Sequence, residues 1–242
     1  MTLYLSRVRL KQAPDTAALA RVLMPPEENA RIAAAHRLVW SLFADAPDRR
    51  RDFLWREDGA STWQHTTFLV LSARKPEDAH RLFEIDEPKL FAPALAPGQR
   101  LRFRLRASPG AADARPGKKR GKRIDPLARA LRDFGNEDRA SNRDAVTQRV
   151  GAEWIVRQGE SAGFHLAEAT GEDGEPCRLL RVDGDDWRVL PREGAKPVRF
   201  SSLDFEGELV LDDPALFLTK LGHGFGRAKA FGCGLMLIRR AR

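Results

Sequence analysis

The sequence predicts an α+β fold built from two βαββαβ units in tandem, one in each half of the chain. Stretches of alternating apolar and polar residues predict half-buried strands, and apolar residues at helical spacing separate these strands. The same order of elements occurs twice, with the turn-forming pair Pro97-Gly98 between the two series. The clearest strand carries an apolar row and an arginine row: Leu101, Phe103, Leu105 and Ala107 against Arg100, Arg102, Arg104 and Arg106.

In the first half, a strand at residues 3–10 is followed by a chain break at Pro25-Pro26 and a helix beginning at Glu27 or Glu28. The buried face of this helix is predicted to contain Ile32, Ala35, Val39 and Phe43. The later elements are strands at 53–55 and 67–71, a helix beginning at Pro76 that carries Ala79, Leu82 and Phe83, and a short extended piece at 90–91. Together they complete the first βαββαβ unit.

In the second half, the arginine-bearing strand is followed by a helix at about 142–157, with Val146, Val150 and Trp154 along one face. Strands are predicted at 163–169, 177–182, 203–211 and 235–238. Asp212 or Asp213 can cap a last helix that has Pro214 at its first position and ends at Gly222. We therefore predict domains at 1–96 and 97–242, with residues 108–141 inserted in the second. The basic part of this insertion has no apolar residue to pack, and we expect it to be mobile until it meets a binding partner.

Bulk properties exclude several classes of protein. Hydrophobic residues make up 42% of the chain, enough for globular cores, but no apolar run approaches the roughly 20 residues that cross a bilayer. Residues 2–11 have the alternation of a strand and not the pattern of a secretory signal. Two cysteines, Cys177 and Cys233, make neither a metal site nor a disulfide framework. A cytoplasmic protein without cofactor or metal fits this composition.

Positive charge is concentrated in two places. The net charge is +8, and residues 100–123 alone hold ten Lys or Arg and one acid, Asp113. Residues 220–242 hold six cations and no acid. Localised positive charge suits a polyanion such as a nucleic acid, whereas a single run of this kind is equally consistent with a solubilising surface. The second run, which lies beside a glycine-rich segment, favours nucleic acid.

The glycine-rich segment at 222–234 contains five glycines with Arg227 and Lys229 between them. Glycine allows sharp turns and close approach of the backbone to a ligand. The segment runs from a predicted helix to a predicted strand, whereas Rossmann and Walker loops run from strand to helix and place phosphate at the helix N-terminus. Nucleotide binding of those two kinds is therefore disfavoured.

Several segments resemble one family. The glycine-rich segment is similar to that of the repeat-associated RNA-binding proteins of CRISPR systems. Residues 35–43 (AHRLVWSLF) and 47–55 (PDRRRDFLW) resemble the first helix and following strand of the CasE family, the type I-E endoribonucleases that process CRISPR RNA. Residues 101–109 (LRFRLRASP) and 205–209 (FEGEL) also resemble that family, and all of these segments occur in the family's order.

The resemblance implies paired ferredoxin-like domains and cleavage of precursor CRISPR RNA at the base of a repeat stem-loop. The expected products are a 5′-hydroxyl and a 2′,3′-cyclic phosphate, formed without a metal ion. The expected partners are CRISPR repeat RNA and other subunits of the Cascade complex, with no membrane. His36 aligns with the family's general acid/base, whereas Ala33 occupies the position where the family often has an assisting tyrosine. Arg31 or Arg37 could assist instead.

From the residues alone, helical periodicity favours a partly buried helix histidine over a catalytic one for His36, and a bystander in its loop over a phosphate contact for His223. His65, His80 and His165 lack neighbours that suggest a site. The arginine row is also consistent with an ordinary exposed sheet face, and a non-catalytic RNA-binding subunit remains an alternative to the enzyme. The predicted RNA contacts are Arg100, Arg102, Arg104, Arg106, Arg115, Lys118, Lys119, Arg120, Lys122, Arg123, Gly224, Gly226, Arg227 and Lys229.

Overall fold

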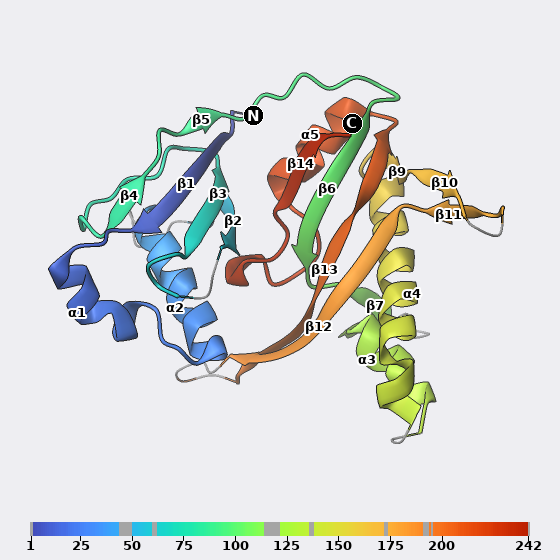
Figure 1. Cartoon of the computed structure of the whole chain (residues 1–242), viewed down its shortest axis with the longest axis horizontal. Helices are drawn as coiled ribbons and strands as arrows, with labels where there is room; N and C mark the ends of the chain where they lie inside the picture. The colour runs from blue at the N-terminus through green and yellow to red at the C-terminus, as the bar shows by residue number, and fades with distance from the viewer. Residues whose placement is uncertain are drawn as a thin grey trace. The chain divides into compact units, whose positions relative to one another are not determined.

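The structure is a computed structural model of the chain (Figure 1). It describes residues 2–43, 50–59, 62–113, 122–135, 138–171, 174–190, 194 and 196–241. The chain divides into two compact units. The first unit comprises Met1–Ala94, Val189–Arg199 and Ala228–Leu235, and the second comprises Leu95–Arg188, Phe200–Arg227 and Met236–Arg242. The predicted domain limits at residues 96 and 97 differ from this division mainly in the two later segments that belong to the first unit.

The first unit is ferredoxin-like, with an antiparallel sheet in the order β2-β3-β1-β4. Counted along the chain, these strands lie in the order second, third, first and fourth, which is the order of a βαββαβ unit, and the short β5 (Lys89–Leu90) also pairs with β1. The strand at residues 3–10 and those at 53–55 and 67–71 are confirmed. The elements are β1 (Tyr4–Leu10), α1 (Pro14–Leu23), α2 (Glu28–Ser41), β2 (Phe53–Asp58), β3 (Thr67–Ser72), β4 (Phe83–Ile85) and β5 (Lys89–Leu90).

The predicted helix beginning at Pro76 is wrong. The carboxylate of Asp78 accepts hydrogen bonds from the backbone N–H groups of Leu82 (3.0 Å) and Phe83 (2.9 Å), which gives this segment an alternative to helical hydrogen bonding. Phe83 begins β4 and is buried against the core. The sequence analysis also missed α1, although Pro14 occupies its first turn as Pro often does.

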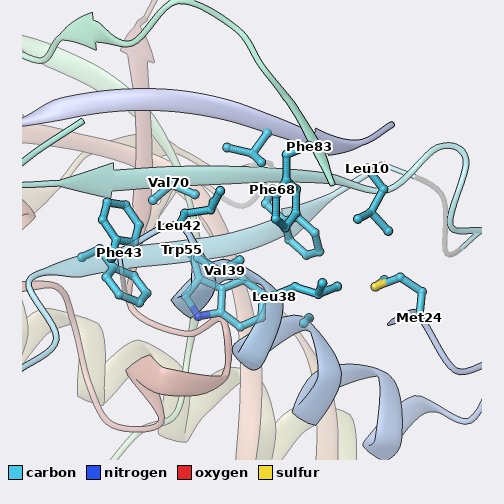
Figure 2. Close-up of a cluster of buried hydrophobic side chains, with 13 residues drawn as sticks. Leu10, Met24, Leu38, Val39, Leu42, Phe43, Trp55, Phe68, Val70 and Phe83 are labelled. Carbon is cyan, nitrogen blue, oxygen red and sulfur yellow. The ribbon is translucent and has the colours of Figure 1, made fainter. Parts of the chain in front are cut away.

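The core of the first unit lies between α2 and the sheet (Figure 2). Glu27 caps α2 by accepting from the N–H groups of Asn29 (3.0 Å) and Ala30 (2.5 Å), which starts the helix where the sequence predicts. Ala35 and Val39 of its predicted buried face are fully buried, whereas Ile32 is only partly so. The whole cluster comprises Val8, Leu10, Met24, Ala35, Leu38, Val39, Leu42, Phe43, Phe53, Trp55, Phe68, Val70 and Phe83. Burial of this face fixes the rotation of α2, and hence the direction in which its polar residues point.

The second unit is also ferredoxin-like. Its sheet has the order β12-β13-β6-β14, and β9 also pairs with β13, so β9-β13-β6-β14 repeats the strand order of the first unit. Helices α4 and α5 supply core side chains to it: Trp154 packs on Phe205 (ring centroids 5.3 Å apart), and Phe217 packs on Phe164 (5.6 Å). The main elements are β6 (Arg100–Ala107), α4 (Asp138–Glu160), β9 (Phe164–Leu166), β10 (Glu168–Thr170), β11 (Pro176–Arg178), β12 (Leu180–Leu190), β13 (Val198–Leu211), α5 (Pro214–His223) and β14 (Met236–Arg240).

Most predictions for the second half are confirmed. The four apolar residues of β6 are buried, and α4 contains the predicted helix but extends it at both ends. Asp213, not Asp212, caps α5. The predicted end at Gly222 is wrong, because α5 continues to His223 and Gly224, with a φ of +75°, follows it.

The inserted region at 108–141 contains more regular structure than the sequence suggests. It holds the paired strands β7 (Ala111–Asp113) and β8 (Lys122–Ile124), the helix α3 (Pro126–Ala130), the 3₁₀ turn η1 (Leu131–Asp133) and the start of α4. Four of the predicted RNA contacts lie outside the described residues: Arg115, Lys118, Lys119 and Arg120. The predicted mobility of this basic stretch concerns the same part of the chain. Lys122 and Arg123 are described as backbone in β8 only. Within the described residues, no helix combines the length and apolar character that a membrane span needs.

Candidate functional site

The strongest candidate site surrounds His36 in the first unit. Its imidazole contacts two aromatic rings, with centroids 5.9 Å from Trp40 and 5.5 Å from Phe231. Trp40 is one helical turn further along α2, because residues four apart share a helix face. Phe231 belongs to η2 (Lys229–Phe231), the 3₁₀ turn in the second half of the glycine-rich segment. The fold thus brings part of this segment onto the helix that carries His36.

Two local features hold η2 in place. The indole Nε1 of Trp55, a residue that is 1% exposed, donates a hydrogen bond to the carbonyl of Ala230 at 3.1 Å. Ala228 and Gly232 bracket the turn with left-handed φ values of +52° and +79°. A Cβ on Gly232 would lie 3.3 Å from the Trp55 ring, so this position needs glycine for both its backbone conformation and its close packing. These contacts tie η2 to β2.

The environment of His36 favours its neutral form. Burial lowers the pKa of the imidazole below its ordinary value, and the positive charges of Arg51 and Arg37 lower it further, while a backbone hydrogen bond with Ala230 acts in the opposite direction. The Nδ1 atom is buried without a hydrogen-bond partner among the described residues. A neutral imidazole can act as a proton acceptor at neutral pH.

Arg51 is a neighbour of His36 that the sequence analysis did not single out. It precedes β2, and its Nη1 is buried with no hydrogen-bond partner in the described part of the chain. Burial lowers the pKa of its guanidinium, which nevertheless stays charged at neutral pH. A buried guanidinium nitrogen that has no hydrogen-bond partner among the described residues can be satisfied by an anion that binds beside it. The only sequence signal was the arginine run at 49–51 within the segment that resembles the CasE family.

The two cations suggested as substitutes for an assisting tyrosine differ in their surroundings. Arg31 lies 3.5 Å from the carboxylate of Glu57, and both side chains are largely buried. Arg37 is exposed and lines, with His36, Trp40 and Ser41, a recess of about 360 Å³. Arg37 is therefore the better placed of the two to meet a substrate beside the imidazole.

The first half of the glycine-rich segment serves the packing of the second unit. Gly226 has a φ of +69°, and a Cβ on it would lie 2.7 Å from the carbonyl oxygen of Ser108. The backbone N–H of Arg227 donates to the same oxygen at 2.9 Å. Gly224 and Gly226 therefore have structural reasons to be glycine. Lys229 lies in η2 of the first unit and Arg227 in the second unit, so the two predicted cations belong to different units.

The arginine row on β6 faces acidic residues of β13. Glu208 accepts from Arg100 (2.5 Å) and Arg102 (2.8 Å), and Asp204 pairs with Arg106 (2.7 Å). The two guanidinium groups on Glu208 lower the pKa of its carboxyl, Arg102 most strongly. Arg104 is exposed and has no ion pair among the described residues. The alternating acids at 204, 206 and 208 were a sequence signal for this pairing that the analysis did not use.

A larger recess of about 720 Å³ follows this sheet face in the second unit. Its arginines are Arg102, Arg104, Arg178, Arg181 and Arg239. The recess is thus basic overall, but no histidine lines it. The chemistry of the described lining suits acid–base groups at the smaller recess beside His36, and an anion at the larger one.

The other histidines do not form comparable sites. His165 Nδ1 lies 2.8 Å from Asp212 Oδ1 on the surface of the second unit, and both side chains are more than half exposed. His65, His80 and His223 are exposed. No group of three or more His, Cys, Asp or Glu side chains that could hold a metal ion occurs in the described ranges.

Comparison with known proteins gives consistent matches. Residues 3–240 match the family model described as CRISPR associated protein. The chain is 30% identical over 237 residues to the CRISPR-associated endoribonuclease Cse3 of Thermus thermophilus, covering 93% of this chain and 95% of that protein. It is 27% identical over 205 residues to the CRISPR system Cascade subunit CasE of Escherichia coli, covering 84% and 89%. The solved structure of Thermus thermophilus Cse3 bound to an RNA representing a pre-cleavage complex matches with a TM-score of 0.67 and 26% identity, covering 99% of this chain and all of that one.

Proposed function

The chain belongs to the CRISPR-associated protein family, and on that premise we propose that it is a metal-independent endoribonuclease that cleaves precursor CRISPR RNA at the base of the repeat stem-loop. The observation that carries this proposal is the His36 site, where an imidazole of lowered pKa lies beside Trp40, η2 and the partly buried guanidinium of Arg51. This site combines a proton acceptor with fixed positive charge, as cleavage of a phosphodiester requires.

The proposed reaction uses the RNA's own 2′-hydroxyl as the nucleophile. His36 accepts the proton as the 2′-oxygen bonds to phosphorus. The bond from phosphorus to the 5′-oxygen breaks, and that oxygen takes a proton from water, after which the imidazolium returns its proton to solvent. The products are a 2′,3′-cyclic phosphate and a 5′-hydroxyl. Proton transfer of this kind contributes roughly 10²–10⁴-fold to the rate. Arg51, Arg37 and Lys229 would offset the charge that develops on the phosphoryl oxygens.

The comparisons support both the activity and the partners. The Thermus thermophilus relative is named an endoribonuclease, and its solved structure contains an RNA that represents a pre-cleavage complex. The Escherichia coli relative is named a Cascade subunit. By extension, this protein binds CRISPR repeat RNA and stays on the cleaved hairpin with other Cascade subunits. It would act in the cytoplasm, where such RNA is transcribed.

RNA binding is proposed for the basic surfaces predicted from the sequence. A protein reads an RNA stem largely through its shape and phosphates, and several cations must reach the backbone at once. Arg104 is the member of the β6 row best placed to do so, because its guanidinium has no intramolecular ion pair among the described residues. The neighbouring arginines could bind phosphate only in competition with Glu208 and Asp204.

A second candidate function is a non-catalytic RNA-hairpin subunit. One observation favours it: Ala33, one turn before His36, cannot assist proton transfer as a tyrosine could. In that case the protein would hold the hairpin tightly without cutting it.

Incubating repeat RNA with the protein in EDTA separates the two candidates. A specific cut that leaves a 2′,3′-cyclic phosphate, and is lost in His36→Ala, supports the enzyme. His65→Ala is a matched control, because His65 is an exposed histidine of the same unit that lies outside the site. The variant should cleave the RNA at the wild-type rate. Tight binding without a cut supports the non-catalytic subunit.

A further inference from the structure

The recess beside His36 has features of a binding site for one planar group. It is lined by His36, Arg37, Trp40 and Ser41, all within two turns of α2. Its volume of about 360 Å³ lies near the lower end of ligand pockets, which span about 300–1,000 Å³. The recess therefore suits one small ring system better than an extended ligand or a folded segment of protein.

An aromatic ring forms one wall of this recess. Trp40 packs edge-on against the core residue Phe53, with centroids 5.4 Å apart and ring planes at 62°. Its indole is only partly buried, so the remainder of the ring is available to the recess. Fixed aromatic rings of this kind stack on unpaired nucleobases, and such stacking tolerates different bases because every base has a π-face.

The polar groups of the recess fit a nucleotide. The Ser41 hydroxyl donates to the carbonyl of Leu38 at 2.8 Å, which leaves the oxygen lone pairs as acceptors for an N–H or amino group. Arg37 is exposed at the same recess and can meet a phosphate. Among the described residues, the lining thus combines a stacking surface, one hydroxyl acceptor and one exposed cation.

We propose that the His36–Ser41 recess holds the nucleobase of a nucleotide directly flanking the scissile phosphate, stacked on Trp40. This inference rests on the proposed function, because the recess and the cleavage site share the His36 imidazole. A base held there must leave the helical stack. Unstacking frees the sugar–phosphate backbone from A-form geometry, so that the 2′-oxygen, phosphorus and 5′-oxygen can align for displacement. Trp40 is on this view a positioning residue.

The test is a double-mutant cycle that combines one substitution in the protein with one in the RNA. Each combination is measured as a single-turnover cleavage rate constant at saturating protein. Trp40→Ala should slow cleavage of intact repeat RNA by about 5- to 150-fold, the range that corresponds to stacking of one base. An RNA with an abasic site at one of the two flanking nucleotides should be slowed similarly in the wild type. Combining the two changes should cause little further loss, and Trp40→Phe should restore most of the rate on intact RNA.

Trp63→Ala is the matched control, since Trp63 packs against the same core cluster but does not line the recess. Any loss of cleavage rate in Trp63→Ala should be independent of the loss caused by either abasic site, so that the two fold-changes multiply when combined. Independent, multiplying losses for Trp40→Ala at both flanking positions would overturn the inference.

A binding measurement keeps this test separate from that of the proposed function. Repeat RNA is labelled with the fluorescent base 2-aminopurine at the flanking position. The fluorescence of this base should be quenched when the RNA binds the wild-type protein or Trp63→Ala, but not when it binds Trp40→Ala. This signal does not require cleavage. Quenching without any cut would count against the enzyme while supporting the recess, whereas cleavage without quenching at either flanking position would count against the recess alone.

Discussion

Replacing Trp55 by phenylalanine tests whether η2 positions His36. The change removes the indole N–H that donates to the Ala230 carbonyl at 3.1 Å, in a side chain that is 1% exposed. A hydrogen bond of this kind contributes about 1 kcal/mol net. Loss of the second ring from a packed core costs on the order of 2 kcal/mol more, below the 3–5 kcal/mol of a full truncation to alanine. The free energy of unfolding should therefore fall by about 3 kcal/mol.

Thermal unfolding followed by circular dichroism should show this loss as a drop in Tm of about 6–12 °C for a chain of this length. The functional effect should be separable from it. Once η2 is released from Trp55, Phe231 and the Ala230 carbonyl no longer hold the imidazole, and misplacement by about 1 Å can cost as much as 10²-fold in rate. Single-turnover cleavage, measured well below the lowered Tm, should be slower by tenfold or more.

Trp63→Phe provides the comparison, because Trp63 packs on the same core and makes no hydrogen bond to η2. It should lower Tm without a comparable change in the cleavage constant. If Trp55→Phe is folded at the assay temperature and cleaves within twofold of the wild type, the turn does not position His36 and the reasoning fails.

Four further outcomes follow from the same structure. Arg51→Gln removes a positive charge that lowers the pKa of His36, so the acidic limb of the single-turnover pH–rate profile should move to higher pH. Because the folded protein holds the pKa of His36 below 6.5, the unfolded chain binds more protons than the folded one on acidification. The free energy of unfolding, measured with urea, should therefore fall as the pH drops from about 6.5, and His36→Gln should make that fall smaller. Arg104→Ala should make the log–log dependence of RNA affinity on salt shallower by about 1, whereas Glu208→Gln, which frees two arginines, should make it steeper. Gly232→Ala should cost roughly 1–2 kcal/mol of unfolding free energy in urea titrations, because its φ is +79°.

The sequence predicted strands well where one face is buried. On β6, every second residue enters the core, and this alternation alone locates the strand and its arginine face. The helix expected after Pro76 failed because a single carboxylate, Asp78, takes up backbone N–H groups that a helix would have used. Periodicity counts apolar positions and does not detect such local competition.

The site was predictable only in part. His36 was identified through its family resemblance, since spacing alone favoured a partly buried helix histidine. The contact between His36 and Phe231 joins segments from opposite ends of the chain, and it depends on a left-handed turn and on the Trp55 indole. Arg51 is a candidate because its Nη1 is buried and has no hydrogen-bond partner within the described ranges, which no residue pattern indicates. These features arise from tertiary packing, which residue patterns do not report.

The most direct test is a structure of the protein bound to repeat RNA that carries a 2′-deoxy substitution at the cleaved nucleotide, which prevents reaction. The account predicts that a ring nitrogen of His36 lies within about 3 Å, directly or through one water, of the 2′ position or the 5′-oxygen. It also predicts a guanidinium or ammonium group from Arg37, Arg51 or Lys229 at the phosphate. A scissile phosphate bound away from α2 and η2 would contradict it.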